Sequence, residues 1–272
     1  MRECSTDTRL LFVLPVILGL LVAAGCARNP QALSAPTLIA KRGDTSWDYV
    51  VLGDSTPTGY GVSESYVDYY AAFIEEDLGV KVEIHNFAQD GQSTRILLDH
   101  LRGSEELREA IEGAEVITIW IGWNDLRRSM KVHGNGTCGG TDNLDCIREA
   151  VEGLNANIDA ILDEILSLSS PTETLIRIAD VGNPFVGEWK EQGWFDDMKG
   201  PCFEAWRDHI VESAEQRGVT VVYTYHVING SNGDESVTEK GLTQADGLHF
   251  NKEGHRLLAR LHREIGYSYV SP

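Results

Sequence analysis

Basic residues are scarce in this chain. Its 23 lysines and arginines stand against 42 aspartates and glutamates, so the formal net charge is −19 at pH 7. This charge argues against nucleic acid as a partner and against polyanionic substrates, because both would be repelled. Internal repeats are also lacking, and no second linker interrupts the sequence after residue 44. The segment from residue 45 to residue 272 is long enough to bury a full core, so we predict a single domain there.

Long apolar runs are absent except near the start, where residues 10–25 form one run behind two arginines. Its length suits the core of a signal peptide and is short for a membrane span. We therefore predict a signal peptide over residues 1–25 and export to an oxidising compartment. The run ends at Cys26 in a segment that resembles the lipobox of bacterial lipoproteins, which would give Cys26 a lipid anchor in the membrane. The alternative is cleavage after Ala27, which would release a free secreted protein.

Residues 26–44 carry two prolines and no clear periodicity, so we predict a tether there and the globular domain over residues 45–272. Within the domain, the longest helical pattern covers residues 144–168, with apolar residues at alternating spacings of four and three. We interpret this stripe as the core face of one helix rather than as a dimer seam. A monomer is the expected state.

Strand patterns alternate with helical patterns throughout the domain. The predicted strands cover residues 48–52, 80–87, 115–121, 174–181 and 219–225. The predicted helices cover residues 65–78, 93–113, 144–168, 203–217 and 251–265. This alternation favours an α/β fold in which a mostly parallel five-stranded sheet lies between two helical layers, as in a flavodoxin-like three-layer α/β/α sandwich.

Polar residues directly follow the first three predicted strands. Gly53-Asp54-Ser55 follows the first, a segment ending in Gly91 follows the second, and Gly122-Trp123-Asn124-Asp125 follows the third. The carboxyl ends of parallel strands meet at one edge of a sheet, where ligands bind in such folds. Asp246-Gly247-Leu248-His249 lies in the loop before the last predicted helix. We expect these four segments to form one site.

The residue types in these segments suit attack on a carbonyl group. A serine hydroxyl such as that of Ser55 needs a base to take its proton, and the imidazole of His249 is suited to that role. Asp246 would orient the imidazole and stabilise its protonated form, which completes a predicted catalytic triad. The backbone N–H groups of Ser55 and Gly91 and the side-chain amide of Asn124 would bind the negative charge that develops on oxygen. The sequence therefore predicts an oxyanion hole beside the nucleophile.

The four segments resemble the four sequence blocks of the SGNH hydrolase superfamily, also called GDSL-like lipases and esterases. The matching residues are Ser55, Gly91, Asn124, Asp246 and His249. The resemblance covers residues 48–259 and implies the family's α/β/α fold and an ester hydrolase. It departs at Phe250, where many members have proline after the histidine. No serine in this chain lies in the Gly-x-Ser-x-Gly pattern of the α/β-hydrolases.

The resemblance implies an exported serine hydrolase of the carboxylesterase or lipase type that forms an acyl-enzyme, acting on a small-molecule, glycan or lipid ester. A glycan O-deacetylase or an acyltransferase could use the same site, and a binding protein without turnover is a further alternative. We expect no cofactor. His255 and His262 lack a nearby ligand pattern, so we interpret them as packing or surface residues and predict no metal. Asp54 and Asp125 are expected to hydrogen-bond the turns around the site rather than to act as a glycosidase pair.

Three cysteines lie in the predicted domain. We predict a disulfide between Cys138 and Cys146, in a loop that follows Asn124, because the protein is expected to be exported. Such a bridge would shape one wall of the substrate cleft. Cys202 would then be a buried free thiol, although its pairing with either of the other two is an open alternative.

Residues 183–200 are rich in aromatic side chains and follow the fourth predicted strand. We predict a long loop there, on the same edge of the sheet as Ser55. Its Trp189 and Trp194, together with Trp123, are expected to line the acyl or alcohol pocket. The alternative is that these tryptophans only seal the loop onto the domain.

Overall fold

The computed structural model describes residues 45–270 of the chain. The predicted signal peptide, the predicted tether and the predicted lipidation site at Cys26 lie outside the described residues, so they stay predictions. Within the described range, no helix combines the length and the apolar character that a membrane crossing requires.

The core of the domain is a parallel sheet of five strands in the order β2-β1-β3-β4-β5. The strands are β1 (Ser46–Gly53), β2 (Lys81–Asn86), β3 (Val116–Trp120), β4 (Leu175–Ala179) and β5 (Thr220–Val222). Every residue of β3 and β4 is buried, because helices cover both faces of the sheet. The fold is therefore the predicted α/β sandwich with a five-stranded parallel sheet.

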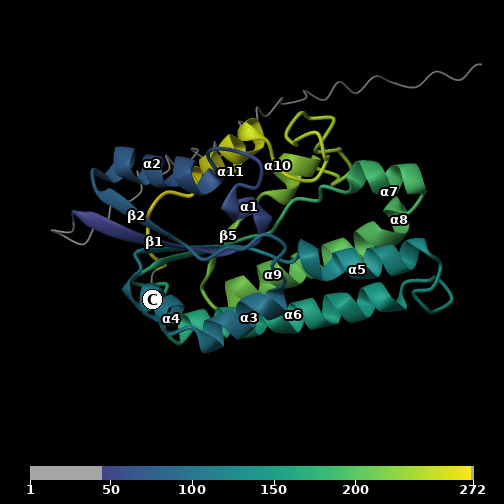
Figure 1. Cartoon of the computed structure of the whole chain (residues 1–272), viewed down its shortest axis with the longest axis horizontal. Coiled ribbons are helices and arrows are strands. Elements are labelled where there is room, and N and C mark those ends of the chain that lie inside the picture. The colour runs from purple at the N-terminus through teal and green to yellow at the C-terminus, as the bar shows by residue number, and fades with distance from the viewer. Residues whose placement is uncertain (1–44, 271–272) are drawn as a thin grey trace, which may run out of the picture. The chain divides into compact units, whose positions relative to one another are not determined.

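Two helical layers enclose the sheet (Figure 1). The helices are α1 (Ser55–Thr58), α2 (Tyr66–Leu78), α3 (Thr94–Gly103), α4 (Glu105–Gly113), α5 (Trp123–Gly134), α6 (Asp145–Leu166), α7 (Val186–Gln192), α8 (Phe195–Met198), the π-helical turn η1 (Lys199–Glu204), α9 (Ala205–Gln216), α10 (Tyr225–Asn229) and α11 (Lys252–Glu264). α2 and α11 pack against each other on one face, and α3, α6 and α9 lie on the other. The apolar stripe of α6 is buried, so it forms the core face that the sequence predicts.

The segment after Asn124 is a helix and not the loop that the sequence analysis predicts. α5 buries Trp123, Leu126, Met130 and His133 at helical spacing. A histidine in this stripe and the glycine-rich segment that follows it weaken the apolar pattern in the sequence. Tertiary packing against α6 stabilises the helix.

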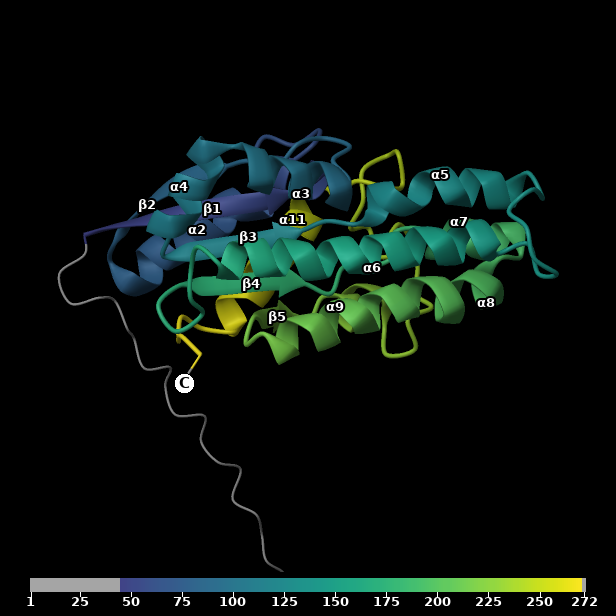
Figure 2. The ribbon, with the colours of Figure 1, turned by 90° about the horizontal axis from the view of Figure 1, so that it is seen from below.

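The predicted long loop at residues 183–200 is also wrong, because most of it is helical. α7 begins after Phe185 and ends at Gln192, and the left-handed backbone of the next residue, Gly193, caps the helix. α8 and η1 then lead into α9. Figures 1 and 2 show α5, α7 and α8 together beyond the carboxyl end of the strands, next to the edge where the site lies. These short helices depend on that packing, because isolated helices of this length are unstable.

Candidate active site

Ser55 lies at the first turn after β1 and begins the short helix α1. The turn is tight because Gly53 has a positive φ of 147°, and a Cβ atom there would lie 2.1 Å from the carbonyl oxygen of Trp120. Asp54 caps α1, since its Oδ1 accepts a hydrogen bond from the backbone N–H of Thr56 at 3.0 Å. This local geometry places the Ser55 hydroxyl at the carboxyl edge of the sheet.

A continuous hydrogen-bond chain links the serine, histidine and aspartate. His249 Nε2 lies 3.1 Å from Ser55 Oγ, and His249 Nδ1 lies 2.6 Å from Asp246 Oδ2. An ionised Asp246 can only accept, so Nδ1 donates and the lone pair of Nε2 faces the serine hydroxyl. The structure thus brings the three predicted triad residues together in the order that proton transfer requires.

Asp246 is held by more than the imidazole. Its Oδ1 accepts the backbone N–H groups of Leu248 and His249, both at 3.0 Å. Partial burial acts to raise the pKa of Asp246, but the hydrogen bonds from His249 and from these backbone groups outweigh it and lower that pKa. The carboxylate therefore stays ionised and remains an acceptor for the imidazole.

The loop that carries His249 is fixed to the loop that follows Ser55. Gln244 Nε2 donates to the carbonyl oxygens of Tyr60 at 2.6 Å and Phe250 at 3.0 Å. The Tyr60 ring packs on the His249 ring, with centroids 4.3 Å apart. These contacts restrict movement of the imidazole, which leaves its Nε2 directed at Ser55.

Three hydrogen-bond donors face the same pocket as Ser55 Oγ. Within residues 45–270, the backbone N–H groups of Ser55 and Gly91 bind no protein acceptor. Gly91 has a positive φ of 74°, a conformation that favours glycine. Asn124 donates one amide hydrogen to the carbonyl oxygen of Gln92 at 3.0 Å, so its second amide hydrogen is available to a ligand.

Asp54 and Asp125 bind the turns around the site, as the sequence analysis predicts. Asp125 accepts hydrogen bonds from the backbone N–H and the hydroxyl of Thr94, which fixes the start of α5 to the start of α3. Burial and, to a smaller extent, the Asp125 carboxylate raise the pKa of Asp54, the Thr56 N–H acts to lower it, and the net result is a pKa of about 7. Neither carboxylate is placed like a member of a glycosidase pair, because both are engaged with backbone groups.

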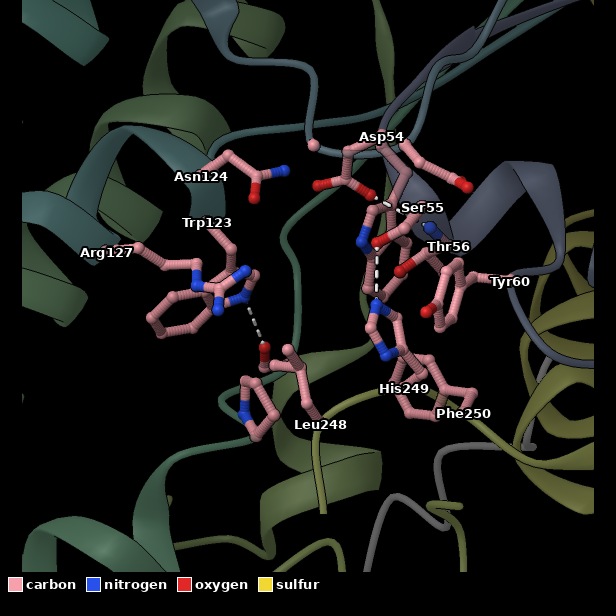
Figure 3. Close-up of a pocket in the computed structure, with 15 residues that line it drawn as sticks. Asp54, Ser55, Thr56, Tyr60, Trp123, Asn124, Arg127, Leu248, His249 and Phe250 are labelled. Atoms are coloured by element: carbon pink, nitrogen blue, oxygen red, sulfur yellow. Dashed lines mark hydrogen bonds between the residues drawn. The ribbon is translucent and has the colours of Figure 1, made fainter. Parts of the chain in front are cut away.

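A cavity of about 310 Å³ opens beside Ser55 (Figure 3). Ser55 and His249 on one side and Gly91 and Asn124 on the other are among the residues that supply its polar groups. Its apolar lining includes Trp120, Trp123 and Phe250. Trp123 lines the pocket as predicted, and its Nε1 donates to the carbonyl oxygen of Gly182 at 2.9 Å, which fixes the indole. Phe250, at the position where the family resemblance departs, packs edge-on against Trp120 and forms part of the wall.

The other two predicted pocket tryptophans lie elsewhere. Trp189 is fully buried behind Trp123, with ring centroids 6.3 Å apart, because α7 turns its indole into the core. Trp194 lies against His133 and lines a second hollow instead of the pocket at Ser55. The prediction that these two residues line the catalytic pocket is wrong. Trp189 instead fits the alternative given in the sequence analysis, because its buried indole packs residues 183–200 onto the domain.

Arg127 and Tyr60 also line the pocket, and the sequence analysis missed both. Arg127 lies three residues after Asn124 on α5, so recognition of that helix would have placed it on the same face. The sequence around Tyr60 carries no comparable signal, because the stacking on His249 joins residues that are distant along the chain.

Cys138 and Cys146 form a disulfide, and Cys202 is a buried free thiol. Burial raises the pKa of the Cys202 thiol to about 11, which makes it unreactive. The bridge joins the segment after α5 to the start of α6, and neither of its cysteines lines the pocket at Ser55 or the second hollow. The expectation that the bridge shapes a wall of the substrate cleft is therefore wrong.

One group of side chains within the described residues could hold a metal ion. Ligand atoms of Asp48, Glu83 and His85 lie within 4.8 Å of one another on β1 and β2, and His85 Nε2 is already 2.8 Å from Asp48 Oδ1. The group lies near the amino end of β1, roughly 20 Å from Ser55 along an extended strand. None of its three residues lines the pocket at Ser55. The pairing of Asp48 with Glu83 across two strands left no pattern in the sequence.

Solved structures share this fold. A lipase from a goat rumen metagenome is 24% identical, with a TM-score of 0.67 over 83% of this chain and 100% of its own. An acetylxylan esterase from Geobacillus stearothermophilus is 18% identical, with a TM-score of 0.60 over 85% and 99%. A psychrotrophic esterase from Pseudoalteromonas sp. is 16% identical, with a TM-score of 0.52 over 81% and 96%. No protein of curated function matches the sequence.

The fold is shared with these solved structures, and at one edge of its sheet a serine, a histidine and an aspartate lie in one hydrogen-bond chain. The model of the GDSL-like Lipase/Acylhydrolase family matches residues 51–257, and the chain belongs to this family. The predicted resemblance is confirmed. The protein is an enzyme that hydrolyses ester bonds.

Proposed function

We propose that this enzyme is an exported serine esterase that acts through Ser55, His249 and Asp246. The observation that carries the proposal is the unbroken chain from Asp246 Oδ2 to His249 at 2.6 Å and from His249 to Ser55 Oγ at 3.1 Å. The predicted signal peptide supports export, and the Cys138–Cys146 disulfide supports an oxidising compartment. Whether Cys26 carries a lipid is a separate prediction.

In the proposed reaction, His249 Nε2 removes the proton of Ser55 Oγ as the oxygen attacks the ester carbonyl. The backbone N–H groups of Ser55 and Gly91 and the free amide hydrogen of Asn124 bind the oxygen that becomes negative. Together they form the oxyanion hole. The imidazolium then gives its proton to the leaving alcohol, which leaves an acyl group on Ser55. Water, activated by His249, hydrolyses this acyl-enzyme and restores the serine. Asp246 stabilises the imidazolium in both halves of the reaction.

The pocket favours short acyl groups. Its volume of about 310 Å³ lies at the small end of ligand pockets, and Trp120, Trp123 and Phe250 are bulky. A glycan O-deacetylase is the second candidate, because acetyl is the shortest common acyl group and a structural neighbour is an acetylxylan esterase. An acyltransferase would need an alcohol in place of the attacking water. Membership of a hydrolase family argues against a binding protein without turnover.

The test is Ser55→Ala, assayed on chromogenic esters of increasing chain length and on acetylated sugars. The variant should lose hydrolysis of every ester, because it removes the nucleophile, and should keep the fold, because Ser55 is at the start of a four-residue helix. Circular dichroism and thermal unfolding check the fold. Activity that stays within about tenfold of wild type in a folded variant would overturn the mechanism.

A further inference from the structure

A second hollow borders the pocket at Ser55 where Arg127 of α5 lines both. Asn124, Arg127 and Lys131 lie three and four residues apart, so they share a face of the helix. Asn124 and Lys131 are separated by roughly 10 Å along the helix axis. We refer to these two hollows, both of which Arg127 lines, together as the groove.

The cations of this groove are free, although the chain has a large excess of acid. Among the described residues, Arg127 and Lys131 make no ion pair and no hydrogen bond through their side chains. Some other exposed arginines pair with carboxylates, as Arg148 does with Asp142 and Asp145, whereas Arg128 and Arg260 form no ion pair among the described residues. Figure 3 shows Arg127 extending into the pocket from the side opposite His249. Its guanidinium thus faces the space that a substrate would occupy.

The opposite wall of the second hollow comes from α7 and its flanks. Phe185 and Trp194 supply aromatic surface there, and Glu188 is the one acidic side chain that lines this hollow. Within residues 45–270, Glu188 forms no ion pair with Arg127 or Lys131. The hollow therefore offers apolar contact for the body of a ligand and, along one side, two cations that form no ion pair among the described residues.

We propose that Arg127, with Lys131 behind it, binds an anionic group on the ester substrate, either a carboxylate or a phosphate. A guanidinium presents a planar fork of donors that matches both anions. The net charge of −19 repels large polyanions, but one anionic group on a small ester can meet Arg127 and Lys131 on the α5 side, away from Asp54, Asp90 and Glu188, which also line the two hollows. This substrate class rests on the proposed function, because it takes Ser55 as the reacting group. It predicts that the enzyme prefers acidic esters to neutral esters of the same shape.

Two matched pairs of acetyl esters test the preference. In one pair the alcohol is glucuronic acid or glucose, and in the other it is glycerol 3-phosphate or glycerol. Wild-type enzyme should hydrolyse the anionic member with the higher kcat/KM in at least one pair, and that pair identifies the anion as carboxylate or phosphate. No preference in either pair would overturn the proposal.

Arg127→Gln should lower the ratio of kcat/KM for the anionic ester to that for the neutral ester by about tenfold or more, because it removes a charge-assisted hydrogen bond. Arg128→Gln is the matched control, since it makes the same charge change on α5 at a residue that lines neither hollow. The control should leave the ratio within about twofold, as expected for a screened surface charge. Equal ratios in wild type and Arg127→Gln, or equal losses in both variants, would overturn the proposal.

Binding to Ser55→Ala separates this proposal from the proposed function. Calorimetry with glucuronic acid and with glycerol 3-phosphate should detect binding that weakens when Arg127→Gln is added to the same protein. If wild type hydrolyses no ester but this binding is present, the esterase mechanism fails and the anion site stands. If esters are cleaved without preference and neither anion binds, the anion site fails and the esterase mechanism stands.

Discussion

His249 and His262 are both imidazoles near the end of the chain, but their surroundings differ in every respect that matters for chemistry. His249 is partly exposed, and each of its ring nitrogens has a polar partner. His262 is buried between α2 and α11, stacks on Tyr66 at 5.3 Å, and leaves its Nδ1 without a partner. Burial, and then the nearby Arg177 cation, hold the pKa of His262 well below its ordinary value. A histidine becomes a candidate base through its partners and its access to substrate, and without them it is a packing residue.

The largest effect should separate these two histidines directly. His249→Ala should lower kcat/KM by about 10⁵-fold or more, because a serine without its base is a poor nucleophile, and should barely change the melting temperature. His262→Ala should instead cost about 2–4 kcal/mol of stability, because it opens a cavity in a packed layer. Ester hydrolysis and thermal unfolding of both variants check this. Similar losses of activity in the two folded variants would remove the distinction.

Asp246→Asn tests how much the role of His249 depends on the carboxylate of Asp246. In the part of the chain that the structure describes, Asp246 is the only hydrogen-bond partner of His249 Nδ1. The amide would favour the wrong tautomer, so we expect kcat to fall by about 10³–10⁴-fold with little change in KM. A fall of less than about tenfold would show that another group can orient the imidazole.

Asn124→Ala should lower kcat by about 10²–10³-fold, because it removes one of the three proposed donors to the oxyanion. The effect should fall on kcat rather than on KM, since the interaction strengthens in the transition state. Steady-state kinetics on a short-chain ester measures the split. An effect confined to KM would mean that Asn124 binds substrate and does not stabilise the oxyanion.

The smallest expected effect concerns His255, which is buried on α11. Burial lowers the pKa of His255 to about 4, whereas an unfolded chain would have about 6.5. Between these values the unfolded state binds the proton and the folded state does not, so acidification from about pH 6.5 to about pH 4 destabilises the fold. At pH 5 the loss from His255 is roughly 2 kcal/mol.

The measurement is the difference in unfolding free energy between wild type and His255→Gln as a function of pH. Asp54 acts in the opposite sense, because its pKa is raised to about 7 and its protonation stabilises the folded state on acidification. Both proteins contain Asp54, so its contribution cancels in the difference. Parallel stability curves for the two proteins would show that His255 is not buried in its neutral form.

The residues that directly follow strands were predictable, and those on short helices were not. Ser55 and Asn124 each come after an apolar run typical of a buried strand, whereas Gly91 follows the more polar strand β2, whose residues are exposed or half-buried. A parallel sheet places the residues after all three strands at one edge. Predicting that Arg127 lines the pocket would have required recognising that α5 is a helix. Predicting that Trp189 is buried would have required the orientation of α7. This helix turns the indole into the core although the sequence around it is mostly polar.

By itself the sequence determined the strands of the sheet and the edge at which Ser55, Gly91 and Asn124 lie, because strand periodicity and strand-end position are local properties of the chain. It also predicted the proposed triad residues Ser55, His249 and Asp246, which the structure brings together. Tertiary structure alone decided which aromatic side chains line the pocket, how Tyr60 packs on His249, and that the cations of α5 face the groove unpaired. These features depend on contacts between segments far apart in sequence. Packing, and not propensity, stabilises the short helices that make those contacts.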